Sequence, residues 1–289
     1  MSQPKENYSA KLRAKSMVYF VICIILTLIC LVPINILIIN ATRKHVDIIS
    51  SVSFIPGSNL AANVKKLLND PMFQFDPFIG FKNSAIIAVG STVLSVFFSA
   101  LTAYGLVVYD FKLRGPAYTF ILVVMMVPMQ VTSVGFLQFM IKLGLSDSFI
   151  PLIVPTIAAP AIVFFMRQYL KSSFPLDIVE AARIDGCGEF RTFLTIAIPM
   201  MKPAIAVQAI FAFIQNWNNF YQPSMILVSR KFEQITMPMM INMLKSNDKI
   251  ADYGVIYAGI ALSIIPVVVI YLLLSRFIVE GVALGGVKE

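Results

Sequence analysis

Charge is scarce in this sequence: Asp, Glu, Lys and Arg make up only 13% of its 289 residues, whereas hydrophobic residues make up 58%. The mean hydropathy of +0.82 lies far above that of a soluble domain. These values exclude a water-soluble globular protein and predict an integral membrane protein. Because roughly 20 residues span a membrane as a helix, the chain has room for six spans.

Ionisable groups are missing from the interior of the apolar runs. No Asp, Glu, Lys, Arg or His lies there away from the ends of the runs, although proton- and ion-coupled carriers need such a group within the membrane. The only histidine, His45, follows the first run, and no residues have the spacing of a metal site, a pair of catalytic carboxylates or a Ser/His/Asp triad. The sequence therefore predicts a protein that is not an enzyme, holds no metal and has no proton relay of its own.

Cysteine is also rare, and a nucleotide motif is missing. Cys23 and Cys30 lie in the first apolar run and Cys187 in a charged stretch, so no pair is typical of a disulfide-stapled domain, and all three are expected to be reduced. The nearest match to a phosphate-binding loop, residues 281–288, lacks the Gly-Lys pair and follows no strand. We expect no cofactor in this chain, so any ATP that such a protein uses would have to bind to another chain.

Six apolar runs are predicted to be transmembrane helices, because a helix satisfies its own backbone hydrogen bonds within one span. The fold class is therefore an all-α integral membrane protein. The first run is too long for a cleaved signal peptide and is expected to remain as an anchor. The approximate bounds of the runs are residues 17–40, 84–109, 118–141, 149–166, 205–228 and 255–277. Flanking them, residues 1–16 form an N-terminal segment and residues 279–289 a C-terminal tail, around a six-helix transmembrane domain of residues 17–278.

The net charge of +8 lies in the segments between the runs rather than on one face, which indicates membrane orientation and not a nucleic-acid surface. With the N-terminus inside, the inner segments hold 13 Lys and Arg residues and the outer segments hold 10. The start of the chain and the short loops, on which the charge rule depends most, favour this orientation. Both termini are expected in the cytoplasm.

Two further patterns concern packing. Residues 59–70, "NLAANVKKLLND", have a helical apolar spacing that ends at Asp70 and Pro71, which predicts a short surface helix in the long first outer loop. In the second run, small residues recur every four positions at Ser91, Ser95, Ser99 and Ala103, which favours close approach of another helix over a role in substrate binding.

Charged residues gather in one stretch, "EAARIDGCGEFRTFLTIAIP", residues 180–199. Ser172 or Ser173 is expected to cap a helix whose first turn holds Pro175, and Gly186 with Gly188 permits a reversal. A second amphipathic helix is expected from residue 189 to residue 198, where proline ends it. The whole loop, residues 172–202, is predicted to be a cytoplasmic docking element; the alternative is a solvated turn.

This stretch resembles the EAA motif of permease subunits of ATP-binding-cassette importers. The matching residues, which the resemblance makes ATPase-docking residues, are Glu180, Ala181, Ala182, Asp185, Gly186 and Pro199. Cys187 stands where alanine is common, and Ile198 replaces a common leucine. In that family the loop is a coupling helix that sits in a cleft of the ATPase subunit.

Other segments resemble the carbohydrate, maltose-type branch of the same family, among them "FIQNWNNFYQPSMIL" and "YAGIALSIIPVVVIYLLLSRFIVEGVALGGVK". The resemblance implies the six-span partner of a heteromeric permease pair in the plasma (inner) membrane of a prokaryote. It further implies a second related permease, two ATPase subunits that bind ATP and Mg, an extracellular solute-binding protein and a sugar substrate, with lipid around the spans and no nucleic acid.

The fifth run is unusual because it is rich in amides and aromatic residues. Amides donate and accept hydrogen bonds, and aromatic faces stack on sugar rings, so this run is expected to line a substrate path. The alternative is that the amides hold helices together and the aromatics form an interfacial belt. The candidate path residues are Gln215, Trp217, Asn218 and Tyr221, with Gln130 and Gln138 of the third run as weaker candidates.

The sequence therefore predicts a permease subunit that translocates a sugar or oligosaccharide by alternating access. One alternative is a permease of the same family for another polar solute, such as glycerol 3-phosphate. A second, from a different class, is a self-contained secondary carrier, which the uncharged spans disfavour.

Overall fold

A computed structural model describes residues 5–229, 231–246 and 252–285, and these residues form helices and loops without a β-strand. The chain divides into two compact units. The first comprises Met1–Phe75 with Leu244–Leu262, and the second comprises Asp76–Met243 with Ser263–Glu289. The all-α fold class predicted from the sequence is thereby confirmed for the described residues.

The first unit begins with α1 (Lys5–Ala41), which starts within the predicted N-terminal segment, and continues with α2 (His45–Ser50), α3 (Leu60–Asn69) and η1 (Pro71–Phe73). The start of α15 (Tyr253–Gly285) also belongs to this unit. The loop that follows α1 is held in place by two buried polar side chains. Arg43 donates to the carbonyls of Asp47 and Ser51 at 2.7 and 3.0 Å, and Asn63 donates to the carbonyls of Ala41 and Arg43 at 2.8 and 2.9 Å. The surface helix predicted in residues 59–70 is confirmed as α3.

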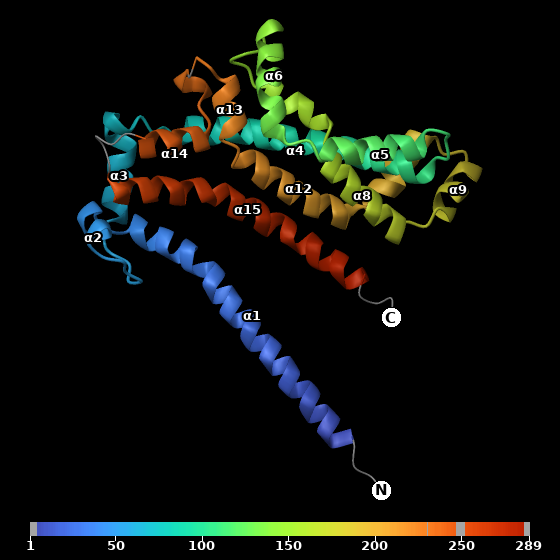
Figure 1. Ribbon diagram of the computed structural model, residues 1–289, viewed down its shortest axis with the longest axis horizontal. Helices are drawn as coiled ribbons and strands as arrows, with labels where there is room; N and C mark the ends of the chain where they lie inside the picture. Colours follow the sequence, from blue (N-terminus) through green and yellow to red (C-terminus); the bar gives the residue numbers. More distant parts are fainter. Residues whose placement is uncertain (1–4, 230, 247–251, 286–289) are drawn as a thin grey trace. The chain divides into compact units, whose positions relative to one another are not determined.

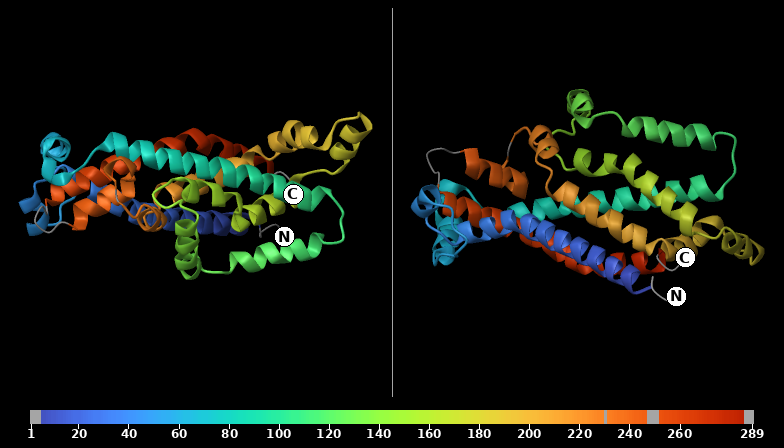
Figure 2. Two further views of the ribbon diagram at one scale, coloured as in Figure 1. Left: turned by 90° about the horizontal axis from the view of Figure 1, so that it is seen from above. Right: turned by 60° about the horizontal axis from the view of Figure 1, so that its bottom comes forward.

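The second unit is built along α4 (Pro77–Val108), whose first turn is capped by the Asp76 carboxylate. Figures 1 and 2 show α8 (Pro160–Ser173) and α12 (Lys202–Trp217) lying along α4, with which both are in contact. The small residues predicted to allow a close approach are all buried in α4. Ser91 Oγ donates to the Leu152 carbonyl at 3.1 Å, and Ser99 Oγ donates to the Ala159 carbonyl at 3.4 Å. The packing role of the stripe is thereby confirmed.

The third run is not one helix, as the sequence suggested, but two. The helices α5 (Arg114–Met125) and α6 (Met129–Lys142) meet at 94°, and Figure 1 shows α6 turning sharply away from α5. Pro128 lies at this break, has no amide proton, and disfavours the helical conformation of the residue before it. Within the described part of the chain, four helices are long and apolar enough to cross a membrane by themselves, and up to six spans result if each bent pair counts as one.

The fourth and fifth runs are interrupted as well. The fourth contains α7 (Ile150–Ile153) and η2 (Val154–Ile157) before α8 begins at Pro160. The fifth, predicted as one helix over residues 205–228, ends as α12 at Trp217 and resumes as α13 (Tyr221–Ile226). After it come η4 (Phe232–Gln234) and α14 (Met237–Ser246). The last helix, α15, runs to Gly285, so the predicted tail is helical up to that residue, and residues 286–289 lie outside the described part.

Candidate functional site

The first helix of the docking loop, residues 172–202, begins later than the sequence suggested. This helix, α9 (Asp177–Ile184), has Leu176 at its N-cap and no side-chain cap. Ser172 and Ser173 instead end α8, where the Ser172 hydroxyl donates to the Tyr169 carbonyl at 3.0 Å. The predicted serine cap is therefore wrong, because both hydroxyls lie on the preceding helix and Ser172 bonds to a carbonyl of that helix.

The reversal after α9 takes place at Gly186. Its φ is +75°, a conformation that side chains with a Cβ rarely adopt. The Gly186 amide donates to the Arg183 carbonyl at 3.0 Å, and the Cys187 amide donates to the Ala182 carbonyl at 2.9 Å. Gly188, in contrast, has φ −68° at the N-cap of α10 (Glu189–Thr192), so its backbone does not require glycine. Of the two predicted turn glycines, only Gly186 supplies the left-handed step.

The second helix of the docking loop continues through Pro199. After α10 follow the π-helical turn η3 (Phe193–Ala197) and α11 (Ile198–Met200), and this stretch meets α12 at an angle of 80°. The prediction that Pro199 ends the helix is therefore wrong. The π-turn shifts the hydrogen-bond register ahead of Pro199, whose nitrogen has no proton to donate.

Five of the six predicted docking residues are exposed, and one is not. Glu180, Ala181, Asp185, Gly186 and Pro199 reach the surface, whereas Ala182 is buried on the inner side of α9. Two apolar side chains of the same stretch that are not among the six predicted docking residues are also exposed. Ile184 is 86% exposed at the last residue of α9, and Phe190 is 58% exposed on α10. The loop thus presents an apolar tip, which we define as Ile184 and Phe190.

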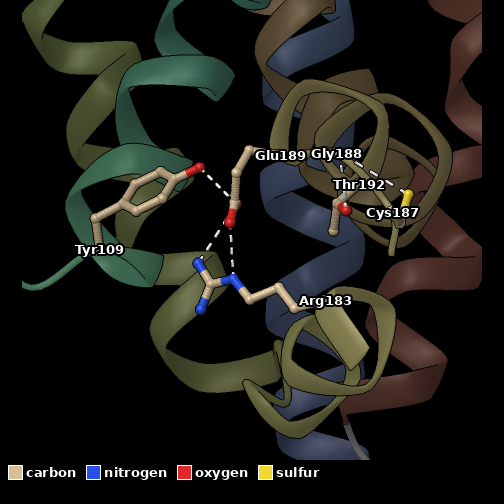
Figure 3. Close-up of polar contacts among 6 residues, drawn as sticks. All are labelled: Tyr109, Arg183, Cys187, Gly188, Glu189 and Thr192. Atoms are coloured by element: carbon tan, nitrogen blue, oxygen red, sulfur yellow. Dashed lines mark hydrogen bonds and ion pairs between the residues drawn. The ribbon is translucent and has the colours of Figure 1, made fainter. Parts of the chain in front are cut away.

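Glu189 holds the two helices of the docking loop together (Figure 3). Its carboxylate accepts from Arg183 Nε at 2.8 Å and from Arg183 Nη2 at 3.4 Å. It also accepts from the hydroxyl of Tyr109, the residue that follows α4, at 2.7 Å. The hydrogen bonds from Arg183 and then from Tyr109 hold the pKa of Glu189 below its usual range, so the carboxylate is charged at neutral pH.

The predicted substrate-path residues lie where α12 ends. Gln215, Asn218 and Tyr221 are exposed, and the Tyr221 hydroxyl is 2.9 Å from Ser133 Oγ on α6. No charged residue occurs between Lys202 and Lys231 except Arg230, which lies outside the described residues. The surface at the end of α12 therefore combines uncharged hydrogen-bonding groups with the exposed rings of Phe220 and Tyr221. The weaker candidates, Gln130 and Gln138, are exposed on α6.

Trp217 differs from these neighbours because it is only 2% exposed. Its ring stacks against Phe213 and Phe81, with centroids 5.6 and 6.1 Å apart. Its Nε1 donates to the Ser263 carbonyl at 3.1 Å. This environment assigns Trp217 a packing role between α4, α12 and α15, so we leave it out of the candidate path.

Among the residues that the structure describes, no group of three or more His, Cys, Asp or Glu could hold a metal ion. His45 lies in the first unit, where its ring stacks on Tyr253 and its Nδ1 accepts from the Tyr253 amide at 3.1 Å.

Comparison with known proteins places these features in a family. A profile described as "Binding-protein-dependent transport system inner membrane component" matches residues 78–283. The arabinooligosaccharides transport system permease protein AraQ of Bacillus subtilis is 38% identical over 211 residues, which cover 73% of this chain and 74% of AraQ. The lactose transport system permease protein LacG of Rhizobium radiobacter is 33% identical over 215 residues, which cover 74% of this chain and 77% of LacG.

A more distant relative is the sn-glycerol-3-phosphate transport system permease protein UgpE of Pectobacterium atrosepticum, 28% identical over 90% of this chain and 93% of UgpE. Among solved structures, a bacterial ABC transporter involved in the import of the acidic polysaccharide alginate superimposes with a TM-score of 0.71. The superposition covers 96% of this chain and 98% of that one at 22% sequence identity, so it shows a shared fold.

Proposed function

Because the chain belongs to the family of binding-protein-dependent transport system inner membrane components, we propose that it is the permease subunit of an ATP-binding-cassette importer for a sugar or oligosaccharide. One observation carries this proposal: the docking loop presents two large exposed apolar side chains, Ile184 and Phe190, which form its apolar tip. Large apolar side chains on a charged loop are typical of a protein interface.

A sugar suits the end of α12 better than an anion does. Gln215 and Asn218 offer donors and acceptors without charge, and Tyr221 offers a ring that can stack on a sugar. Relatives named for arabinooligosaccharides and lactose are more similar to this chain than the relative named for sn-glycerol 3-phosphate. An anionic solute remains the second candidate, since a partner chain could supply the cation that this surface lacks.

Four partners follow from this function. A second, related permease completes a heterodimeric pathway, two ATPase subunits bind ATP and Mg, and an extracellular binding protein delivers the sugar. The docking loop would receive the closing motion of the ATPases, and the spans would respond by alternating access. This chain itself would hold no cofactor.

The docking loop is proposed to face the cytoplasm, together with both termini. The Lys and Arg distribution supports this orientation, and so does the need of the loop to meet an ATPase. The exposed Ile184 then lies on the ATPase side, whereas the exposed Ile55, in the loop between α2 and α3, lies on the outer side. Charged substitutions at these two positions distinguish the two orientations.

Purification of the tagged chain from native membranes in mild detergent tests the assembly. We expect a second permease and an ATPase to co-purify with it, and we expect the separated chain to show no saturable ATP binding. A chain that purifies alone and still transports solute in vesicles would instead be a secondary carrier, and the proposal would fail.

The substrate path is tested by Asn218→Ala. Removing one uncharged hydrogen bond costs about 0.5–1.5 kcal/mol, so sugar uptake should fall by up to about tenfold while ATPase co-purification stays unchanged. Asn216→Ala is the matched control. The side-chain amide of Asn216 donates to the Ala212 carbonyl of its own helix at 2.8 Å, so it is already used within α12. Equal uptake by the two variants would remove Asn218 from the path.

A further inference from the structure

The carboxylate of Glu189 connects three elements that are distant in the sequence. Tyr109 follows α4, Arg183 lies on α9, and Glu189 begins α10 (Figure 3). Both carboxylate oxygens are used, since Arg183 Nε donates to Oε1 while the Tyr109 hydroxyl and Arg183 Nη2 donate to Oε2. We call these three residues the Glu189 clamp.

Beneath the clamp lies an apolar cluster that joins the same elements. Tyr104 of α4 is buried and packs against Phe193 of η3, with ring centroids 5.3 Å apart, and edge-on against Tyr109 at 6.1 Å. Val179 of α9 belongs to the same buried cluster. The inner side of the docking loop is therefore packed onto the end of α4, whereas its apolar tip is exposed.

The polar and the apolar contacts between the docking loop and α4 have different mechanical effects. Apolar packing is not directional, so it resists separation of the loop from α4 more than it sets the angle between them. The hydrogen bonds of the clamp are directional and charge-assisted, so they fix the angle between the loop and α4. Arg183 and Glu189 are 39% and 45% exposed, and exposed ion pairs contribute little to folding stability. A clamp of this kind is better suited to transmitting a movement than to holding the fold.

A movement of α4 would reach the end of α12. The two helices are in contact, and Phe81 near the start of α4 stacks against Trp217 at the end of α12. Asn218, the candidate path residue, follows Trp217 directly and caps α12 through a hydrogen bond from its amide to the Ile214 carbonyl at 3.0 Å. The clamp at one end of α4 is thus connected by packed side chains to the path residues near the other end.

We propose that Glu189 is the positioning residue through which the docking loop moves α4, and that the Tyr109 hydroxyl is its contact on α4. The inference rests on the proposed function, because it assigns a mechanical role within the same importer. It concerns the transfer of motion after docking, so it is separable from docking itself.

The test uses the complete importer, reconstituted in vesicles with its ATPases and binding protein, with Tyr109→Phe and Glu189→Gln. Tyr109→Phe removes only the hydroxyl and keeps the ring that packs on Tyr104. For both variants we expect normal co-purification of the ATPases but at least a fivefold fall in sugar imported per ATP hydrolysed. The double variant should show no further fall, because both changes break the same link. Tyr118→Phe is the control, since its ring keeps the contact with the Arg167 guanidinium, 3.7 Å from the ring centroid.

Each outcome decides between the alternatives. Unchanged import per ATP in Tyr109→Phe and Glu189→Gln overturns the inference and leaves the proposed function standing, provided that the ATPases co-purify. Loss of the ATPases from either variant also overturns it, because the clamp would then shape the docking surface rather than transmit motion. If the unsubstituted chain carries no ATPase, the proposed function itself fails.

Discussion

Gly186→Pro is expected to abolish sugar import and to release most of the ATPase from the complex. Gly186 has φ +75°, whereas proline fixes φ near −65°, so the reversal between α9 and α10 cannot form. The substitution also removes the amide that donates to the Arg183 carbonyl at 3.0 Å. Because Arg183 and Glu189 lie on opposite sides of this turn, the ion pair between them is lost as well. Co-purified ATPase and uptake into vesicles measure the effect.

A pair of serine substitutions separates backbone conformation from side-chain crowding. A Cβ added at Gly186 or at Gly188 would meet no other atom within 4 Å, so neither serine clashes. At Gly186 the left-handed conformation costs a residue with a Cβ about 1–2 kcal/mol, which should weaken ATPase binding by about fivefold or more. At Gly188, φ −68° and ψ 148° suit a serine N-cap, so Gly188→Ser should bind ATPase normally. Equal behaviour of the two variants would show that the turn conformation is irrelevant to docking.

Apolar composition predicted where the helices lie but not where they break. Pro33 lies inside α1 and Pro266 inside α15, and both helices continue through them, whereas the chain bends by 94° at Pro128. A proline removes one backbone hydrogen bond in each case, and the contacts of the surrounding residues decide whether the helix kinks or ends. The mean hydropathy of a window of residues contains no information about those contacts.

The docking loop was predictable from the sequence because its signals are local. Helical spacing, the turn at Gly186 and the resemblance of residues 180–199 to a known motif all lie within one short stretch. The Glu189 clamp was not predicted, since Tyr109 lies 80 positions before Glu189 and no local pattern pairs them. The burial of Trp217 was missed for the same reason: Phe81 and the Ser263 carbonyl meet it only through tertiary packing.

Ile184→Asp is expected to reduce co-purified ATPase by at least tenfold. Ile184 is 86% exposed at the tip of the docking loop, so the substitution does not disturb the interior of this chain. In the complex with the ATPase, the side chain at position 184 would be buried. An aspartate there would place an unpaired charge in an apolar contact. Apolar anchors at the centre of an interface contribute about 2 kcal/mol or more, and an unpaired charge adds to that loss. Ile184→Leu keeps the volume and the apolar character, so it should retain the ATPase.

Ile55→Asp provides the control for this substitution, because Ile55 is 77% exposed and has the same side chain. It lies in the loop between α2 and α3, which the proposed orientation puts outside the cell. We therefore expect Ile55→Asp to keep its full ATPase content, since the introduced charge never meets the ATPase. If Ile55→Asp released the ATPase and Ile184→Asp did not, the membrane orientation would be inverted. If neither substitution released it, the apolar tip of residues 184 and 190 would not be the docking surface, and the ATPase would have to bind elsewhere on the chain.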